Sequence, residues 1–338
     1  MAYAATGLIE ATHYNNFLNG SNQLNSVWST GTGNAGYGQT ALSTVSALGT
    51  VTASQWASLI NTLNSTLTHQ SGSGSGISAT TVGATINYLS TLSTNINTSY
   101  TNRLNKATNG TTLTGTVYTP GFSQANSTSA YQGTFTRTIA FASGDAARYF
   151  FNAGGYINFI TTSAVNNDAT SRSADMVTLI GTNLVNFTGF GASANSGRSG
   201  TGGTLTTNAT GTGYYGLTAS EVSLSYINAT SVTYSGDWVA LNYWTSAQNA
   251  SGNGDKGSTI YIKGYFNSGS QSTYAAPPSN VVGTGTRTVN TTTEDSVNVT
   301  IRYRIDTVYP ESTNLTNSWG TVTIDNPNGA VTDDTTVL

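Results

Sequence analysis

The sequence predicts an α + β protein in which an N-terminal helical module is followed by an antiparallel β-sandwich of jelly-roll-like type. Apolar residues recur at helical spacing in the first third of the chain, and near Asn109 this changes to short β-branched and aromatic runs separated by Gly, Asn and Ser. We therefore divide the 338 residues into a helical part, residues 1–109, and a β part, residues 110–338.

The first helical stretch begins near Thr12 and places Tyr14 and Phe17 among its apolar residues. Gly20 interrupts this spacing, so we expect the helix to end or kink there. Residues 31–39 contain four glycines and predict a turn or loop.

A second helix is predicted from Thr52. Thr52 and Gln55 form a capping-box pattern, and Trp56 begins an apolar face that continues for three turns. The Ser-Gly repeat of residues 71–76 then has the composition of a flexible linker.

A third apolar pattern has heptad spacing. Val82, Leu89 and Ile96 recur every seventh residue, with Leu92 at the matching d position. One interpretation is a short parallel coiled coil, most simply the stem of a homotrimer. The other is a core helix packed on the first two. Ser, Thr and Asn are mediocre helix formers, so packing must hold this helix in either case.

The β part is predicted from short runs rich in Val, Ile, Thr, Tyr, Phe and Trp. These runs are residues 117–118, 134–141, 149–151, 156–160, 176–180, 222–226, 232–234, 238–244, 259–266, 297–305 and 319–324. Strict alternation in the run 297–305 places Arg302 and Arg304 on its outer face. The polar stretches 191–213 and 268–293 predict long loops.

Charge is scarce. Residues 11–102 contain no Asp, Glu, Lys or Arg, and charged residues make up 7% of the whole chain. The net charge is −3, and the only lysines are Lys106, Lys256 and Lys263. Nucleic-acid binding needs clustered basic residues, so we expect no nucleic-acid partner.

The residues that could carry chemistry are dispersed. His13 and His69 both lie in the stretch without carboxylates, which argues against a Ser–His–acid triad. Several acids follow glycine or lie near turns, where capping is the favoured role, and their spacing indicates no catalytic pair. These acids are Asp145, Asp168, Asp175, Glu221, Asp237 and Asp255.

We expect no cofactor, no metal site and no enzymatic activity. The chain has no cysteine, and the acid pairs 294–295 and 333–334 lack the regular spacing of a calcium loop. No apolar run approaches the length of a membrane span, and the N-terminus lacks the pattern of a signal peptide.

Aromatic residues near strand ends and Asn-rich loops suit stacking on sugar rings. The candidate glycan contacts are Tyr214, Tyr215, Trp238, Tyr243 and Trp244, with Tyr261 and Tyr265 in the same setting. The alternative is that most of these rings fill the core of the sandwich.

Two segments resemble structural proteins of large tailed phages, including phages of marine and cyanobacterial hosts. The first, within residues 8–70, resembles their N-terminal modules through His13-Tyr14-Asn15-Asn16, Gly36-Tyr37-Gly38-Gln39, Val51-Thr52-Ala53 with Trp56, and His69-Gln70. The second, within residues 130–180, resembles a recurring β-domain segment labelled virion structural or tail-fibre-like. It consists of Ala146-Ala147-Arg148-Tyr149-Phe150-Phe151-Asn152-Ala153-Gly154-Gly155 and then Ile157-Asn158-Phe159.

The resemblance implies a non-enzymatic virion protein made in the host cytoplasm, with no catalytic residues. The helices would anchor to other virion proteins, as a homo-oligomer and most simply a trimer, and the β domain would project as a fibre or decoration. The expected assembly residues are His13, Tyr14, Phe17, Tyr37, Gln39, Trp56, His69, Val82, Leu89, Leu92 and Ile96. The expected structural motif is Arg148, Tyr149, Phe150, Phe151, Gly154 and Gly155. Arg148 would need a partner acid or carbonyls within an apolar strand.

The alternative function is a receptor-binding adhesin for host surface glycans, and a remoter one is an enzyme that degrades polysaccharide.

Overall fold

The computed structural model combines helices with antiparallel sheets, which confirms the α + β prediction. The residues that it describes are 10–79, 81–83, 85–119, 121–124, 131–168, 170–181, 184–187, 192–193, 201–205, 219–229, 234, 236–247, 256–268 and 296–325. In this part of the chain no helix is both long enough and apolar enough to cross a membrane.

The helices of the described N-terminal residues precede every strand. They are α1 (Ala11–Leu18), α2 (Leu24–Trp28), α3 (Ala53–Ser71) and α4 (Leu89–Thr101). Gly20, with φ 142°, lies in the break between α1 and α2, where the sequence predicts an interruption. α3 begins with the predicted capping box, because the Thr52 side chain accepts from Gln55 N and the Gln55 side chain accepts from Thr52 N.

These helices share a hydrophobic cluster of their own. Trp56 on α3 lies at its centre and contacts the rings of Tyr14 and Phe17 on α1 at about 6 Å. Leu92 and Ile96 on α4 are buried in the same cluster. α4 therefore packs within the chain, as the core-helix interpretation of its heptads expects.

The coiled-coil interpretation is wrong at its first position. Val82 lies in a turn before α4, and its side chain is 91% exposed. The adjacent Gly83 has φ 84°, a left-handed conformation that a helix interior does not accommodate. Residues 71–76 also differ from the predicted flexible linker, because Asn64 Oδ1 accepts from the backbone N–H and the hydroxyl of Ser75.

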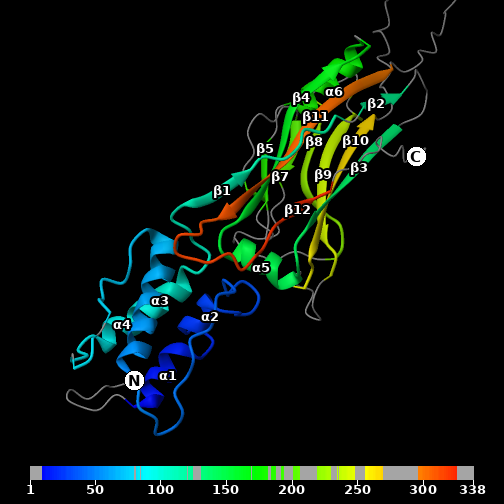
Figure 1. Ribbon diagram of the computed structural model, residues 1–338. Coiled ribbons are helices and arrows are strands. Elements are labelled where there is room, and N and C mark those ends of the chain that lie inside the picture. The colour runs from blue at the N-terminus through cyan, green and yellow to red at the C-terminus, as the bar shows by residue number, and fades with distance from the viewer. Residues whose placement is uncertain are drawn as a thin grey trace, which may run out of the picture.

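The described strands form two six-stranded antiparallel sheets (Figure 1). The first has the order β1-β11-β4-β5-β6, with β2 also paired to β11, and the second has the order β12-β3-β10-β9-β8-β7. The strands are β1 (Asn109–Leu113), β2 (Gly121–Gln124), β3 (Tyr131–Ala140), β4 (Tyr156–Asn166), β5 (Leu184–Phe187), β6 (Ala192–Ser193), β7 (Thr201–Leu205), β8 (Val222–Asn228), β9 (Trp238–Thr245), β10 (Thr259–Ser268), β11 (Val297–Pro310) and β12 (Thr323–Ile324).

Aromatic side chains connect the two sheets. Phe135 on β3 stacks on Tyr303 of β11 with ring centroids 4.7 Å apart and on Phe159 of β4 at 6.1 Å. Gly264 on β10 lies opposite Phe135, whose ring occupies the space that a Cβ atom would take. The alternation predicted for residues 297–305 is confirmed, with Arg302 exposed and its neighbours Ile301 and Tyr303 buried.

Two predicted strands are helices. Residues 149–151 belong to α5 (Gly144–Asn152) and residues 176–180 to α6 (Ser171–Ile180). Their N-caps, Ser143 and Thr170, each accept a hydrogen bond from the backbone N–H three residues later. The β-branched and aromatic side chains of both runs are largely buried within helices, residues 146–152 of α5 without a break, so the strand-like composition misleads there.

Other expectations are confirmed only in part or fall outside the described residues. Of the run 319–324, only Thr323–Ile324 forms a strand, β12. Two parts of the predicted polar loop are strands: residues 192–193 form β6, which pairs with β5, and residues 201–205 form β7, which pairs with β8. The rest of the stretch 191–213, residues 232–233 and nearly all of the predicted loop 268–293 lie outside the described residues.

Figure 1 shows an elongated molecule with α1–α4 at one end and the two sheets extending from it. α5 lies where the helices meet the strands, and α6 lies near the opposite end of the sheets.

Candidate functional site

Three of the predicted carboxylates on or near helices α5 and α6 have structural partners, whereas Asp175 Oδ2 is buried without one. Asp145 pairs with Arg148 at 2.9 Å on α5, and Asp237 pairs with Arg172 at 2.8 Å with both side chains fully buried. Asp168 accepts from Thr170 N and from the Ser296 hydroxyl, and hydrogen bonds of this kind hold the pKa of its carboxyl below the ordinary value despite burial.

Within the described residues no group of His, Cys, Asp and Glu side chains is arranged to hold a metal ion. Asp255 and the acid pairs 294–295 and 333–334 lie outside those residues.

Most of the expected assembly residues are buried within the chain itself. Tyr14, Phe17 and Trp56 fill the core of the helices, where Trp56 Nε1 donates to Tyr88 OH at 2.9 Å. Leu89 is half-buried against the same core, and His13 contributes to the cap of α1 through its Nδ1, which accepts from Glu10 N. Tyr14, Phe17 and Trp56 are therefore not available for contact with another chain.

Two other residues expected in assembly lie on a loop that meets the β part of the chain. This junction loop, residues 30–39, contains Tyr37 and Gln39 from the first phage-like segment. Tyr37 is fully buried; its hydroxyl donates to Arg103 O at 2.6 Å and accepts from Gln70 Nε2 at 2.9 Å. Burial also raises the pKa of Tyr37, so the phenol stays protonated and remains a donor.

Gln39 joins the junction loop to the segment that follows β11. Its Nε2 donates to Thr316 O at 2.8 Å, and its Oε1 accepts from Thr316 N at 2.9 Å. Ser318 adds a bond from its hydroxyl to Tyr37 O. The side-chain amide of Gln39 thus pairs with the backbone N–H and C=O of Thr316 as a neighbouring strand would, although the two residues are 277 positions apart in the sequence.

Helix α5 holds the other side of the junction loop through two buried polar side chains. Arg148 donates from Nη1 to Ala35 O at 2.7 Å and from Nη2 to Thr30 O at 2.6 Å. Asn152 Nδ2 lies within 3.1–3.3 Å of the carbonyl oxygens of Gly33, Ala35 and Gly36. The second phage-like segment thus binds the backbone of the first.

The Arg148 prediction is corrected in one respect and confirmed in another. The residue lies on a helix, not a strand. Its guanidinium does bond to an acid, Asp145, and to backbone carbonyls, as the sequence predicts. Gly154 and Gly155, at the turn after α5, have space only for hydrogen, because Lys106 lies against the first and the Phe150 ring against the second.

His69 completes the junction from α3. Its Nδ1 lies 2.9 Å from Glu311 Oε1, and both side chains are nearly inaccessible. Burial lowers the pKa of His69 and outweighs the opposite effect of Glu311, so the neutral imidazole donates from Nδ1 to the carboxylate. Burial alone would raise the pKa of Glu311, but bonds from His69, Asn314 and Thr313 lower it.

Acidification is expected to destabilise the protein through this pair. Unfolded His69 takes up a proton as pH falls through its ordinary pKa of about 6.5 whereas folded His69 resists it, so stability falls there. Glu311, whose folded pKa is depressed, adds a further loss below about 4.5. Urea unfolding at about pH 7.5 and about pH 5.5 measures the loss of stability that is due to His69.

His69→Gln is the control, because it removes this imidazole and should reduce the difference in the free energy of unfolding between the two pH values. A protein that becomes more stable on acidification would contradict the neutral assignment and indicate a charged His69–Glu311 pair.

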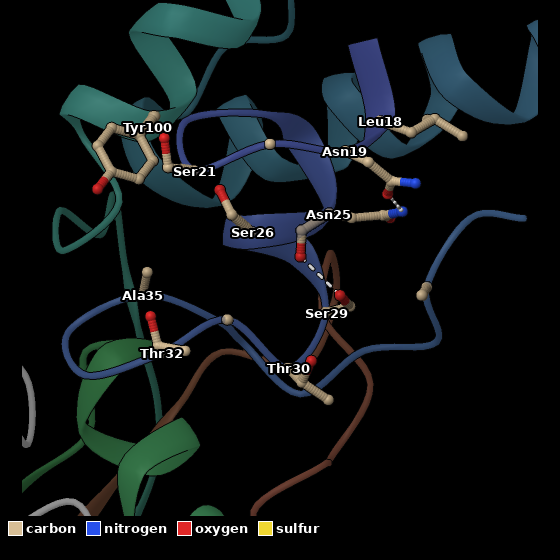
Figure 2. A pocket seen from close by; sticks show the side chains of 13 residues that line it. Leu18, Asn19, Ser21, Asn25, Ser26, Ser29, Thr30, Thr32, Ala35 and Tyr100 are labelled. Carbon is tan, nitrogen blue, oxygen red and sulfur yellow. Dashed lines mark hydrogen bonds between the residues drawn. The ribbon is translucent and has the colours of Figure 1, made fainter. Parts of the chain in front are cut away.

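A pocket of about 480 Å³ lies beside the junction loop (Figure 2). Its lining contains no charged residue and consists of Leu18, Asn19, Gly20, Ser21, Asn25, Ser26, Ser29, Thr30, Gly31, Thr32, Ala35, Ala41 and Tyr100. Several of its polar groups bond to one another or to backbone, as Ser29 Oγ does to Asn25 O at 2.6 Å. A lining of this kind lacks a general acid, a general base and a phosphate-binding cation.

The candidate glycan contacts divide between the two faces of their sheet. Trp238 and Trp244 are half-buried on the outer face of β9, whereas Tyr243 points inward and is fully buried, so its prediction as a surface contact is wrong. Alternation along the strand explains the difference. Tyr214 and Tyr215 lie outside the described residues.

Neither a protein-family model, nor a curated protein, nor a solved structure matches this chain. The strongest candidate functional feature in the described residues is the junction, because its buried polar side chains connect the helices to the β part. Sequence reasoning selected Tyr37, Gln39, His69 and Arg148 but missed Glu311 and Thr316, which no motif or spacing marks.

Proposed function

We propose that this chain is a non-enzymatic structural component of a tailed-phage particle. The observation that supports it most is the meeting of the two phage-like segments at one buried junction. Arg148 and Asn152 bind backbone carbonyls of the junction loop, and Gln39 and His69 bind the segment after β11. Residues that bind backbone in this way fix the relative position of two parts of a chain, which is a structural task.

In this proposal residues 1–109 form the anchoring and oligomerisation module, and residues 110–338 form a β-sandwich domain that projects from it. The separate hydrophobic cluster of α1–α4 supports the division, and the stacking of Phe135 on Phe159 and Tyr303 supports the sandwich. The boundary is shared, because Val27 and Tyr37 pack into the cluster of the β part. We still propose a homotrimer by analogy with phage fibre proteins, although the heptad positions of α4 no longer support it.

The proposal is tested on particles of the phage whose genome encodes this chain. Gradient-purified particles are expected to contain it, and antibodies raised against it are expected to decorate one repeated position in electron micrographs. A chain that is found in the lysate of infected cells but is absent from purified particles overturns the proposal.

Attachment to the particle is expected to be insensitive to salt. Residues 11–102 carry no charge, so the contacts of α1–α4 with a partner rest on packing and neutral hydrogen bonds. Raising NaCl from about 0.15 M to about 1 M shortens the Debye length from about 8 Å to about 3 Å, yet little charge is present to be screened.

Sedimentation of particles at the two salt concentrations, followed by quantification of the chain in pellet and supernatant, measures this. A virion protein held by ion pairs is the internal control for release. Release of this chain by salt would show that its attachment does not run through the uncharged helices.

A further inference from the structure

The outer face of the second sheet carries aromatic side chains at alternate positions of three neighbouring strands. Its half-buried rings, which we call the outer aromatic face, are Tyr226 on β8, Trp238 and Trp244 on β9, and Tyr261 and Tyr265 on β10. The intervening residues, such as Tyr243 and Ile262, are buried in the core. The core therefore does not account for the outward rings.

The rings form two platforms. Trp244 lies opposite Tyr261 in the strand register, and their rings stack at 5.0 Å with an interplanar angle of 19°. Trp238 contacts Tyr226 at 5.3 Å and Tyr265 at 6.2 Å. Tyr261 and Tyr265 are four residues apart along β10, which places the platforms about 13 Å from each other.

A polar band lies between the platforms. The Glu221 carboxylate accepts from Asn242 Nδ2 at 2.7 Å and from the Tyr265 hydroxyl, and it is exposed. Lys263 is the register partner of Asn242, and its Nζ lies 4.7 Å from the centre of the Tyr265 ring. The band offers an acceptor, an amide and an ammonium donor with no net charge.

We propose that the outer aromatic face binds a neutral oligosaccharide lying across β9 and β10. Aromatic rings suit the C–H faces of sugar rings, the near-parallel pair Trp244 and Tyr261 and the more tilted group around Trp238 alike. Glu221, Asn242 and Lys263 suit the hydroxyl groups of the sugar. A single lysine in a band that also carries a carboxylate does not suit a phosphate backbone. The outward positions of β9 and β10 carry no Leu, Ile, Val, Met or Arg, so no large aliphatic side chain accompanies the rings on these strands.

This inference does not depend on the virion proposal, since a sugar-binding face serves a free adhesin equally well. The whole chain is tested on an array of immobilised neutral oligosaccharides of glucose, galactose, mannose and N-acetylglucosamine, with sialylated glycans alongside. The variants are Trp244→Ala, Tyr261→Ala and Glu221→Gln. Tyr156→Ala, a half-buried tyrosine on β4 of the other sheet, is the matched control.

Neutral oligosaccharides are expected to bind and to bind better than sialylated ones. Removal of either ring should weaken binding roughly three- to tenfold, while Tyr156→Ala retains it. Glu221→Gln leaves Lys263 uncompensated, so sialylated glycans should gain relative to neutral ones. Circular dichroism and thermal melting show whether each variant is folded. If a ring deletion unfolds the chain, the test rests on Glu221→Gln, an exposed substitution, and on its relative binding of sialylated and neutral glycans.

The proposal is overturned if no neutral oligosaccharide binds, or if binding is the same in Trp244→Ala, Tyr261→Ala and Tyr156→Ala. It is also overturned if the face binds a protein in place of any saccharide, and the ring variants abolish the binding of that protein.

Discussion

Replacing Arg148 with methionine is expected to lower the free energy of unfolding by about 3 kcal/mol. The side chain is 5% exposed, and it is the donor at 2.6–2.7 Å to the carbonyl oxygens of Thr30 and Ala35. Methionine fills similar space but donates nothing, so these oxygens lose their charged donor where the side chain is buried. The ion pair with Asp145 adds little, because that carboxylate is largely exposed.

Urea unfolding of matched variants measures the effect. Arg302→Met removes an exposed arginine from β11 and should change stability by less than about 0.5 kcal/mol. The loss of stability in Arg148→Lys should lie between the losses in Arg148→Met and Arg302→Met. Lysine keeps the positive charge, but one ammonium group does not reproduce the forked geometry of the guanidinium. If Arg148→Met behaves like Arg302→Met, the junction does not depend on this side chain.

The elements that could be predicted from sequence are those whose signal is local. α3 follows from the Thr52–Gln55 box and one apolar face, and β11 from the alternation between Val297 and Ile305. Helix α5 is predicted wrongly because Tyr149, Phe150 and Phe151 have the composition of a strand. The Ser143 cap and the buried spacing Ala147, Phe150, Phe151 do indicate the helix, but only when spacing is weighed above composition.

The junction could be predicted only in its parts. The sequence marks Tyr37, Gln39 and Arg148 as members of two distinctive segments, and it marks Arg148 as needing partners. It contains no signal that pairs the segments, because Arg148 recognises backbone carbonyls, which every residue possesses. Glu311 and Thr316 lie more than 200 residues from their partners His69 and Gln39, a separation that no local pattern spans.

Gly38→Ala is expected to destabilise the protein by about 3–5 kcal/mol, the largest effect of any single methyl group that we predict. Gly38 has φ 70°, and a Cβ atom there would overlap Cδ2 of the Tyr149 ring. Two costs therefore add: the left-handed backbone of a residue with a side chain, at about 1–2 kcal/mol, and displacement of a buried ring. Gly38 and Tyr149 come from the two phage-like segments, so the change acts on the place where they meet.

Gly76→Ala and Gly320→Ala separate these costs. Both glycines have φ near 70°, and no heavy atom lies within 4 Å of the position that a Cβ atom would take, so each should show the backbone cost alone. Tyr149→Ala, combined with Gly38→Ala, should be less destabilising than the sum of the single changes, because the ring that clashes is gone. Equal destabilisation by Gly38→Ala and Gly76→Ala, with additive behaviour in the double variant, would show that the two segments do not meet at Gly38.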